Sequence, residues 1–136
     1  MSASNPAVDM AKTFDFDWLD KIKLERAINK KKEGLEEMKQ FIEDNKVLDP
    51  KADYSNIVKF IIGLSRQTNN AIKKDAVEIA ILLANNLKLN FKTQIFEITG
   101  PFIDMLERGL MSDTVLEFIT NMFKVYGFDG FVPAVL

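Results

Sequence analysis

The sequence predicts an all-α protein, an α-solenoid built from about three pairs of helices. Apolar residues recur three and four positions apart in six successive segments, as on one face of an α-helix. No segment alternates apolar and polar residues as a half-buried β-strand does. A short motif also returns at intervals of about forty residues, which indicates a repeated structural unit.

The composition limits the classes of function. With 136 residues, 47% apolar and 28% charged, the chain suits one globular domain. A net charge of −2 gives no overall attraction to nucleic acid or membranes. The chain has no cysteine and no histidine, so it lacks disulfides, thiolate ligands and the commonest general base. We therefore expect a non-catalytic protein with no cofactor and no metal site.

The first third of the chain predicts two helices after a short polar segment. Residues 1–13 are small and polar, and we expect them to be flexible. Helices are expected over 14–28 and 28–45, each carrying an apolar stripe. The stripe residues are Phe14, Trp18, Leu19 and Ile22 in the first helix and Leu35, Met38, Phe41 and Ile42 in the second.

Four further helices follow the connector "VLDPKADYS". Ser55 is expected to cap the third helix, and "RQTNN" separates it from an alanine-rich fourth helix that ends near Leu87. The fifth helix, over 91–106, is expected to bend or break at Gly100-Pro101. After "ERGLMSD", the last apolar stripe consists of Val115, Phe118, Ile119, Met122 and Phe123.

The repeated motif is an apolar residue followed by glutamate. It occurs at Leu35-Glu36, Val77-Glu78 and Leu116-Glu117, so the glutamates are 42 and 39 residues apart. This is the period of helix pairs in HEAT and armadillo repeats. We expect Leu35, Val77 and Leu116 to point into one continuous core, with three stacked pairs over residues 14–127.

Lysines occur where two of the helices begin, at Lys30 to Lys32 and at Lys73 and Lys74. Positive charge at a helix start opposes the helix dipole, so these lysines do not stabilise their own helices. In a solenoid, the turns near 26–31, 66–71 and 108–113 would line one edge. The lysines are then either part of a solvated surface or a basic edge that attracts an acidic partner.

On these residues the chain resembles a TOG domain, the tubulin-binding HEAT module of microtubule polymerases and CLASP-type regulators. The similar segments are "FDWLDKI", "KKKEGLEEMKQFIED", "DYSNIVKFIIGLSRQTNNAIKKDAVEIAILLANNL" and "NFKTQIFEITGPFIDMLERG", within about residues 16–126. In the family a tryptophan stands in the first turn, where this chain has Ile28, and a valine stands where it has Asn70. The family has six helix pairs, and this chain has room for three.

The resemblance implies a cytoplasmic, cytoskeleton-associated protein that binds tubulin or microtubules through the turns of its helix pairs. The residues placed there are Ile28, Lys30, Lys31, Lys32, Thr68, Asn69, Asn70, Lys73, Lys74 and Arg108. Ile28 can instead belong to the core, and Thr68 to Asn70 can serve only as a helix break and cap. The alternative function is a HEAT-type scaffold or adaptor that does not bind tubulin.

The end of the chain, residues 128–136, is apolar and contains Gly130 and Pro133. Disordered segments avoid such a composition, and the last unit of a solenoid needs a cap. We therefore expect this tail to fold back over the last pair or to form a homodimer contact with a second copy. The third alternative is the unfinished next helix of a longer solenoid.

Overall fold

The computed structural model describes residues 7–45 and 47–135, and it confirms the all-α class. Within these ranges no residue belongs to a β-strand, and Val8 and Leu48 form a single isolated bridge. The helices are α1 (Met10–Thr13), α2 (Phe16–Leu24), α3 (Ile28–Asp44), α4 (Ser55–Ser65), α5 (Asn70–Leu87), the short 3-10 helix η1 (Lys88–Phe91), α6 (Lys92–Glu107), α7 (Ser112–Tyr126) and α8 (Phe128–Val135).

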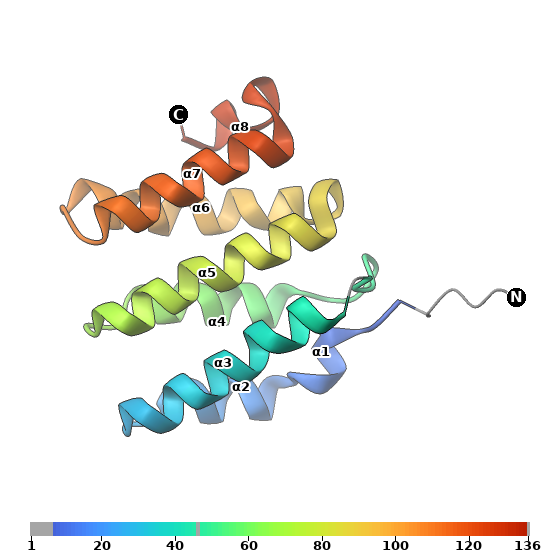
Figure 1. Cartoon of the computed structure of the whole chain (residues 1–136), viewed down its shortest axis with the longest axis vertical. Coiled ribbons are helices and arrows are strands. Elements are labelled where there is room, and N and C mark those ends of the chain that lie inside the picture. Colours follow the sequence, from blue (N-terminus) through green and yellow to red (C-terminus); the bar gives the residue numbers. More distant parts are fainter. Residues whose placement is uncertain (1–6, 46, 136) are drawn as a thin grey trace, which may run out of the picture.

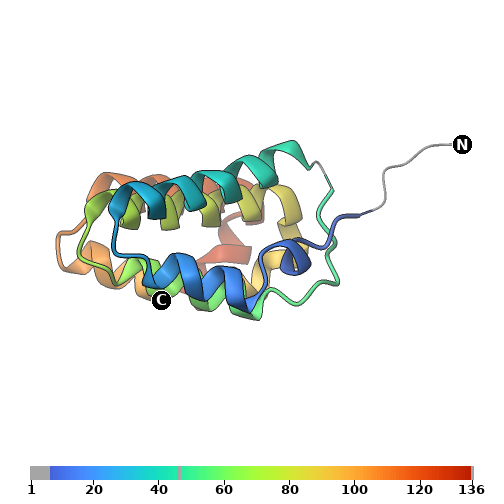
Figure 2. The same cartoon turned by 90° about the horizontal axis from the view of Figure 1, so that it is seen from below.

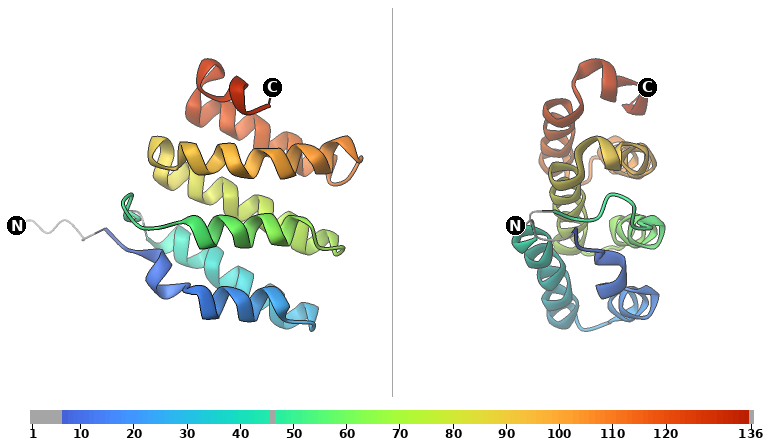
Figure 3. Two further views of the ribbon diagram at one scale, coloured as in Figure 1. Left: turned by 180° about the vertical axis from the view of Figure 1, so that it is seen from behind. Right: turned by 90° about the vertical axis from the view of Figure 1, so that its right-hand side faces the viewer.

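The helices from α2 to α7 form two layers that run the length of the molecule (Figure 1). One layer contains α2, α4 and α6, and the other contains α3, α5 and α7, as the side view in Figure 3 shows. Consecutive helices pair across the layers, α2 with α3, α4 with α5 and α6 with α7. Three helix pairs are therefore stacked in the order of the sequence.

The core lies between the layers, and α5 is at its centre. This helix contacts α3 and α7 in its own layer and α4 and α6 in the other. Ala76, Ala80 and Ala84 are fully buried on it. Because alanine adds little bulk to the helix surface, these positions allow neighbouring backbones to approach closely. The alanine-rich sequence of α5 therefore suits its central position in the core.

Two helix starts show how the local sequence sets the ends of the elements. Asn69 caps α5, because its side-chain oxygen accepts hydrogen bonds from the backbone N–H groups of Ala71 and Ile72 at 2.9 and 3.2 Å. The prediction that Ser55 caps α4 was wrong. Asp53 instead accepts hydrogen bonds from the backbone N–H and the hydroxyl of Ser55, at 3.0 and 2.7 Å.

Of the bend or break expected at Gly100-Pro101, the break was wrong, because α6 runs without interruption from Lys92 to Glu107 with Pro101 inside it. Proline disfavours a helical conformation in the preceding residue, mainly through contact with that residue's Cβ. Gly100 has no Cβ that could make this contact with Pro101. The glycine thus removes the contact that would otherwise oppose a helix at this point.

The repeated motif is only partly reproduced in the core. Leu35 and Val77 are fully buried, whereas Leu116 is 51% exposed, so the prediction for Leu116 was wrong. Its neighbour Val115 is fully buried instead. The physical reason is the position of α7 at the end of its layer. Within its layer α5 has a helix on each side, whereas among the described residues α7 has only α5 beside it, and α8 packs against α7 but leaves Leu116 exposed.

Both ends of the described chain pack against the stack. In the segment expected to be flexible, Met10 is fully buried and the backbone N–H of Val8 donates to the Val47 carbonyl at 3.0 Å. Residues 1–6 of that segment lie outside the described residues. At the other end, α8 packs against α6 and α7, and Phe131 is fully buried.

Candidate binding edge

The three turns inside the helix pairs lie along one edge of the molecule (Figure 1). These turns connect α2 to α3, α4 to α5 and α6 to α7, and they occupy residues 25–27, 66–69 and 108–111. The view from below in Figure 2 places them together at the end opposite the connectors between successive pairs. We call residues 24–32, 66–74 and 108–111 the turn edge. All ten residues predicted to bind a partner belong to it.

Two of the predicted contact lysines are buried within the fold. Lys31 is 5% exposed, and its Nζ donates to the Lys23 carbonyl at 3.0 Å and to Gln67 Oε1 at 2.6 Å. Lys73 is 7% exposed, and its Nζ donates to the Gln67 carbonyl. The sequence predicted that these lysines are either solvated surface residues or contacts for an acidic partner. Both predictions were wrong for Lys31 and Lys73, because they are buried and hydrogen-bonded within the protein.

The positions of Lys31 and Lys73 explain why positive charge stands at these helix starts. In an antiparallel pair, the start of the second helix lies beside the end of the first, where carbonyl groups lack partners within their own helix. Lys31 reaches a carbonyl in the last turn of α2, and Lys73 reaches one that follows α4. The ends of α2 and α4 carry the negative pole of the helix dipole, so each lysine stabilises the preceding helix.

A buried group of charges holds α3 against α5 behind this edge. Lys39 Nζ lies 2.6 Å from both Asp75 Oδ1 and Glu78 Oε2. Lys32 Nζ lies 3.5 Å from Asp75 Oδ2, so one predicted contact lysine is partly engaged here. No buried side-chain nitrogen or oxygen among the described residues lacks a hydrogen-bond partner. These charges therefore act in the packing of the two helices.

The two buried lysines of α3 differ in their electrostatics. Burial lowers the pKa of Lys31, with a smaller opposing effect from Glu25, because its hydrogen-bond acceptors are uncharged. Burial acts on Lys39 in the same direction, but its hydrogen bonds to Asp75 and Glu78 outweigh it and raise the pKa above the ordinary value. Lys39 is therefore firmly charged in the fold.

The remaining predicted contact residues are more accessible. Lys30, Thr68 and Asn70 are exposed, and Ile28 is 38% exposed at the start of α3 rather than part of the core. Two exposed cations have acidic neighbours on their own helices. Lys74 Nζ lies 4.0 Å from Glu78 Oε1, and Arg108 Nε lies 3.2 Å from Asp104 Oδ2. Exposed pairs of this kind contribute little to stability, so both cations can exchange partners.

The predicted contact residues leave out several exposed residues of the turn edge, among them Leu24, Leu110 and Arg66. Leu24 is 67% exposed at the end of α2, Leu110 is 38% exposed in the third turn, and Arg66 is exposed in the second. Leu24 and Leu110 have the apolar character of core residues, and only their place at helix ends indicated otherwise. Arg66 stands in "RQTNN" and could have been found from the predicted turn.

An open groove of about 710 Å³ lies between the second and third turns of this edge. Buried Ser65, Lys73 and Met105 line its floor. The other lining residues are Arg66, Thr68, Gly100, Pro101, Asp104, Arg108 and Leu110. Three of the lining side chains are cationic and one is anionic, so the groove carries an excess of positive charge.

The described part of the chain contains neither a cluster of metal ligands nor a membrane-spanning helix. No group of three or more acidic side chains within residues 7–45 and 47–135 could hold a metal ion. In the same ranges, no helix is both long enough and apolar enough to cross a membrane.

The comparisons with known proteins complete this picture. No family model matches the chain, and none of the curated proteins or solved structures compared with it is a match. The geometry of the turn edge is therefore the basis for assigning a function.

Proposed function

We propose that this protein is a non-catalytic binding module that uses its turn edge to bind tubulin or microtubules. The observation that carries the proposal is the placement of all three turns along one edge, with Ile28, Lys30 and Arg108 accessible on it. An apolar residue among cations suits an acidic protein surface, because charge complementarity guides encounter and apolar contact adds affinity.

The proposal includes a structural part, that the three helix pairs are HEAT-like repeats of a short solenoid. Antiparallel pairs stacked in sequence order, with equivalent turns on one edge, support it. The spacing of 42 and 39 residues between Glu36, Glu78 and Glu117 supports it as well.

We restrict the proposed contact surface to residues whose polar groups are not needed within the fold. The ammonium groups of Lys31 and Lys73 donate hydrogen bonds to backbone carbonyls of the protein itself. The side-chain oxygen of Asn69 accepts a hydrogen bond in the cap of α5. Replacing these three residues would disturb the structure itself. We therefore assign the contact to the accessible residues Ile28, Lys30, Lys32, Thr68, Asn70, Lys74 and Arg108, and add Leu24, Arg66 and Leu110.

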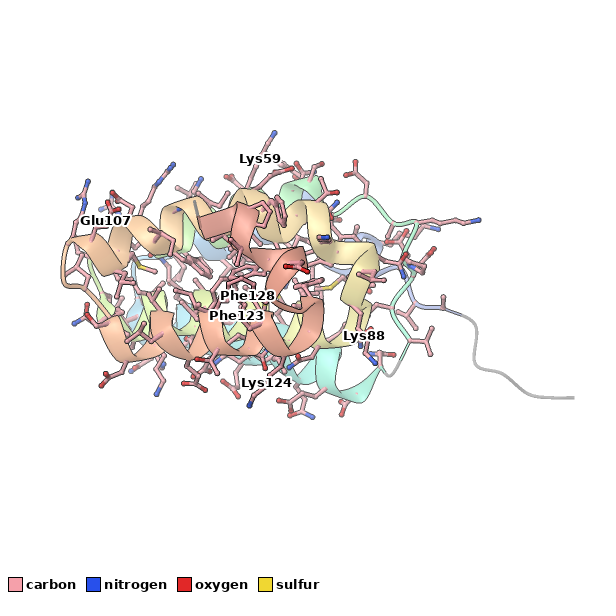
Figure 4. The ribbon with its side chains drawn as sticks, turned by 90° about the horizontal axis from the view of Figure 1, so that it is seen from above. Lys59, Lys88, Glu107, Phe123, Lys124 and Phe128 are labelled. Carbon is pink, nitrogen blue, oxygen red and sulfur yellow. The ribbon has the colours of Figure 1, made fainter. Side chains whose placement is uncertain are left out.

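The test is co-sedimentation with microtubules together with size-exclusion chromatography with unpolymerised tubulin. Ile28→Glu and Lys30→Glu should each weaken binding about threefold to tenfold, and affinity should fall as salt increases. Lys124→Glu is the matched control, because Lys124 is an exposed lysine at the other end of α7 (Figure 4).

Each outcome bears on the proposal. Loss of binding in both turn-edge variants, with Lys124→Glu unaffected, supports it. Equal weakening by all three variants would indicate general charge attraction and contradict a specific edge. A wild-type protein that binds neither form of tubulin at micromolar concentration would overturn the tubulin assignment and favour the scaffold alternative.

A further inference from the structure

We infer that the groove between the second and third turns is a docking site for an acidic peptide segment of the partner. The inference rests on the proposed function, since the groove forms part of the same edge. It adds the place where the partner's chain enters the protein and the chemistry of the segment that enters.

The shape of the groove fits a short stretch of polypeptide. Its volume of about 710 Å³ lies within the range of protein binding pockets and gives room for several side chains. The α4–α5 turn contributes Arg66 and Thr68, α6 contributes Pro101 and Met105, and the third turn contributes Leu110. The groove thus lies on the turn edge and is lined from two of its turns and from α6.

The chemistry of the groove favours carboxylates around an apolar residue. Met105 and the buried stem of Lys73 give an apolar floor, and Leu110 extends it to the surface. Arg66 and Arg108 stand exposed on the lining. Arginine can bind a carboxylate with two parallel hydrogen bonds, which gives direction as well as attraction.

The two arginines are available to a ligand. Among the described residues, Arg66 forms no ion pair within 4 Å, and Arg108 pairs only with Asp104 on its own helix. Both members of that pair are exposed, so a carboxylate from the partner can replace Asp104 at small cost. The ammonium group of Lys73 is already bonded to the Gln67 carbonyl, and it adds positive charge below the floor.

The test uses a synthetic peptide of about ten residues in which leucine is flanked on both sides by glutamates. It is titrated into isotopically labelled full-length protein, and backbone amide shifts are followed by NMR. The largest shifts are expected at Thr68, Arg108 and Leu110. Arg66→Gln and Arg108→Gln should each weaken binding about threefold to tenfold, because each removes one charged contact.

Lys59→Gln is the matched control, because Lys59 is an exposed cation on α4 that does not line the groove. Leu110→Ser tests the apolar part of the site without a change of charge and should also weaken binding. A second peptide with glutamine in place of glutamate should bind poorly. Thermal midpoints of all variants show whether the fold is intact.

The inference is overturned if shifts spread over all exposed lysines, or if Arg66→Gln and Lys59→Gln behave alike. The experiments distinguish failure of this inference from failure of the proposed function. If tubulin binding depends on Ile28 but not on Arg66 or Leu110, the function stands and the groove is wrong as the docking site. If the peptide binds in the groove but tubulin does not bind the protein, the groove stands and the tubulin assignment is wrong.

Discussion

Lys39 Nζ lies 2.6 Å from Asp75 Oδ1 and joins α3 to α5 through a buried ion pair. Both side chains are at most 10% exposed, and Glu78 accepts a second hydrogen bond from the same ammonium group at 2.6 Å. A buried charge without its partner keeps the cost of leaving water and loses the attraction that offsets it. This ion pair therefore fixes the position of α3 relative to α5, its neighbour in the same layer.

The first prediction concerns this pair. Lys39→Met should lower the free energy of unfolding by about 3 kcal/mol, because Asp75 stays buried with only Lys32 near it. The double variant Lys39→Met with Asp75→Leu should recover most of the loss. Urea denaturation of the two single variants and the double variant gives the coupling energy. If the double variant loses as much stability as the two single variants together, the pair does not act as a unit.

The second prediction separates two neighbouring lysines. Lys31→Met should cost about 1–3 kcal/mol of stability, because the carbonyl of Lys23 and the side chain of Gln67 lose a buried donor. Lys30→Met should change stability by less than about 0.5 kcal/mol, because Lys30 is exposed. Thermal melts of the two variants under the same conditions decide the matter. Equal effects would contradict the structural role given to Lys31.

The third prediction concerns the backbone at the end of α5. Lys88 has φ 51° and ψ −124°, outside the small left-handed region that side chains with a Cβ tolerate. Lys88→Gly should therefore raise stability by about 1 kcal/mol, although glycine gains freedom in the unfolded chain. Met111→Gly is the comparison, because Met111 at φ 53° and ψ 36° lies within the allowed left-handed region. Met111→Gly should raise stability less than Lys88→Gly does, as measured by urea denaturation. A larger gain from Met111→Gly would refute the backbone explanation.

The fourth prediction is a fall in stability at alkaline pH caused by two tyrosines. Burial raises the pKa of Tyr54 and of Tyr126 from 10.0 to about 12. The folded state therefore holds each phenolic proton more tightly than the unfolded state. The stabilisation is complete below pH 10 and is lost as the pH rises from 10 to about 12.

Tyr126→Phe isolates one of these contributions. Between pH 8 and pH 11 this variant should lose about 1 kcal/mol less stability than the natural chain, as measured by urea denaturation at both pH values. Lys39 weakens the fold in the same range because its pKa is raised, and Lys31 acts in the opposite sense because its pKa is lowered. Both lysines are common to the two proteins, so the difference reports the tyrosine. An identical pH dependence would refute the assignment.

The fifth prediction concerns the packing of α8. Phe131 is fully buried between aromatic neighbours, with ring centroids 6.3 Å from Phe118 and 5.3 Å from Phe123. Phe131→Ala should cost about 3 kcal/mol or more. Phe128 is 70% exposed and stacks on Phe123 with ring centroids 5.7 Å apart, so Phe128→Ala should cost much less. Figure 4 shows the two side chains close together.

Sedimentation equilibrium of the same two variants addresses the expected homodimer. If the exposed ring of Phe128 forms a contact with a second copy, Phe128→Ala should lower the mass of the species in solution while stability changes little. A monomeric natural chain would remove the homodimer prediction and leave α8 as a cap on one molecule.

The sequence by itself determined that the chain is helical and where its helices pair. The three- and four-residue spacing of apolar side chains depends only on helix geometry, so residues such as Leu35, Met38 and Phe118 could be assigned to the core from the sequence alone. The breaks at "RQTNN" and "ERGLMSD" placed the turns, and the predicted solenoid of helix pairs implied that those turns share an edge.

Only the tertiary structure decided which of two adjacent residues is buried and which is exposed. Lys30 and Lys31 are adjacent, and their side chains leave the helix about 100° apart. Lys31 is buried because the ends of α2 and α4 bring a carbonyl and the Gln67 side chain to it. Leu116 is exposed because, among the described residues, α8 packs against α7 without covering it. Such facts depend on contacts between segments far apart in the sequence, and local spacing carries no information about them.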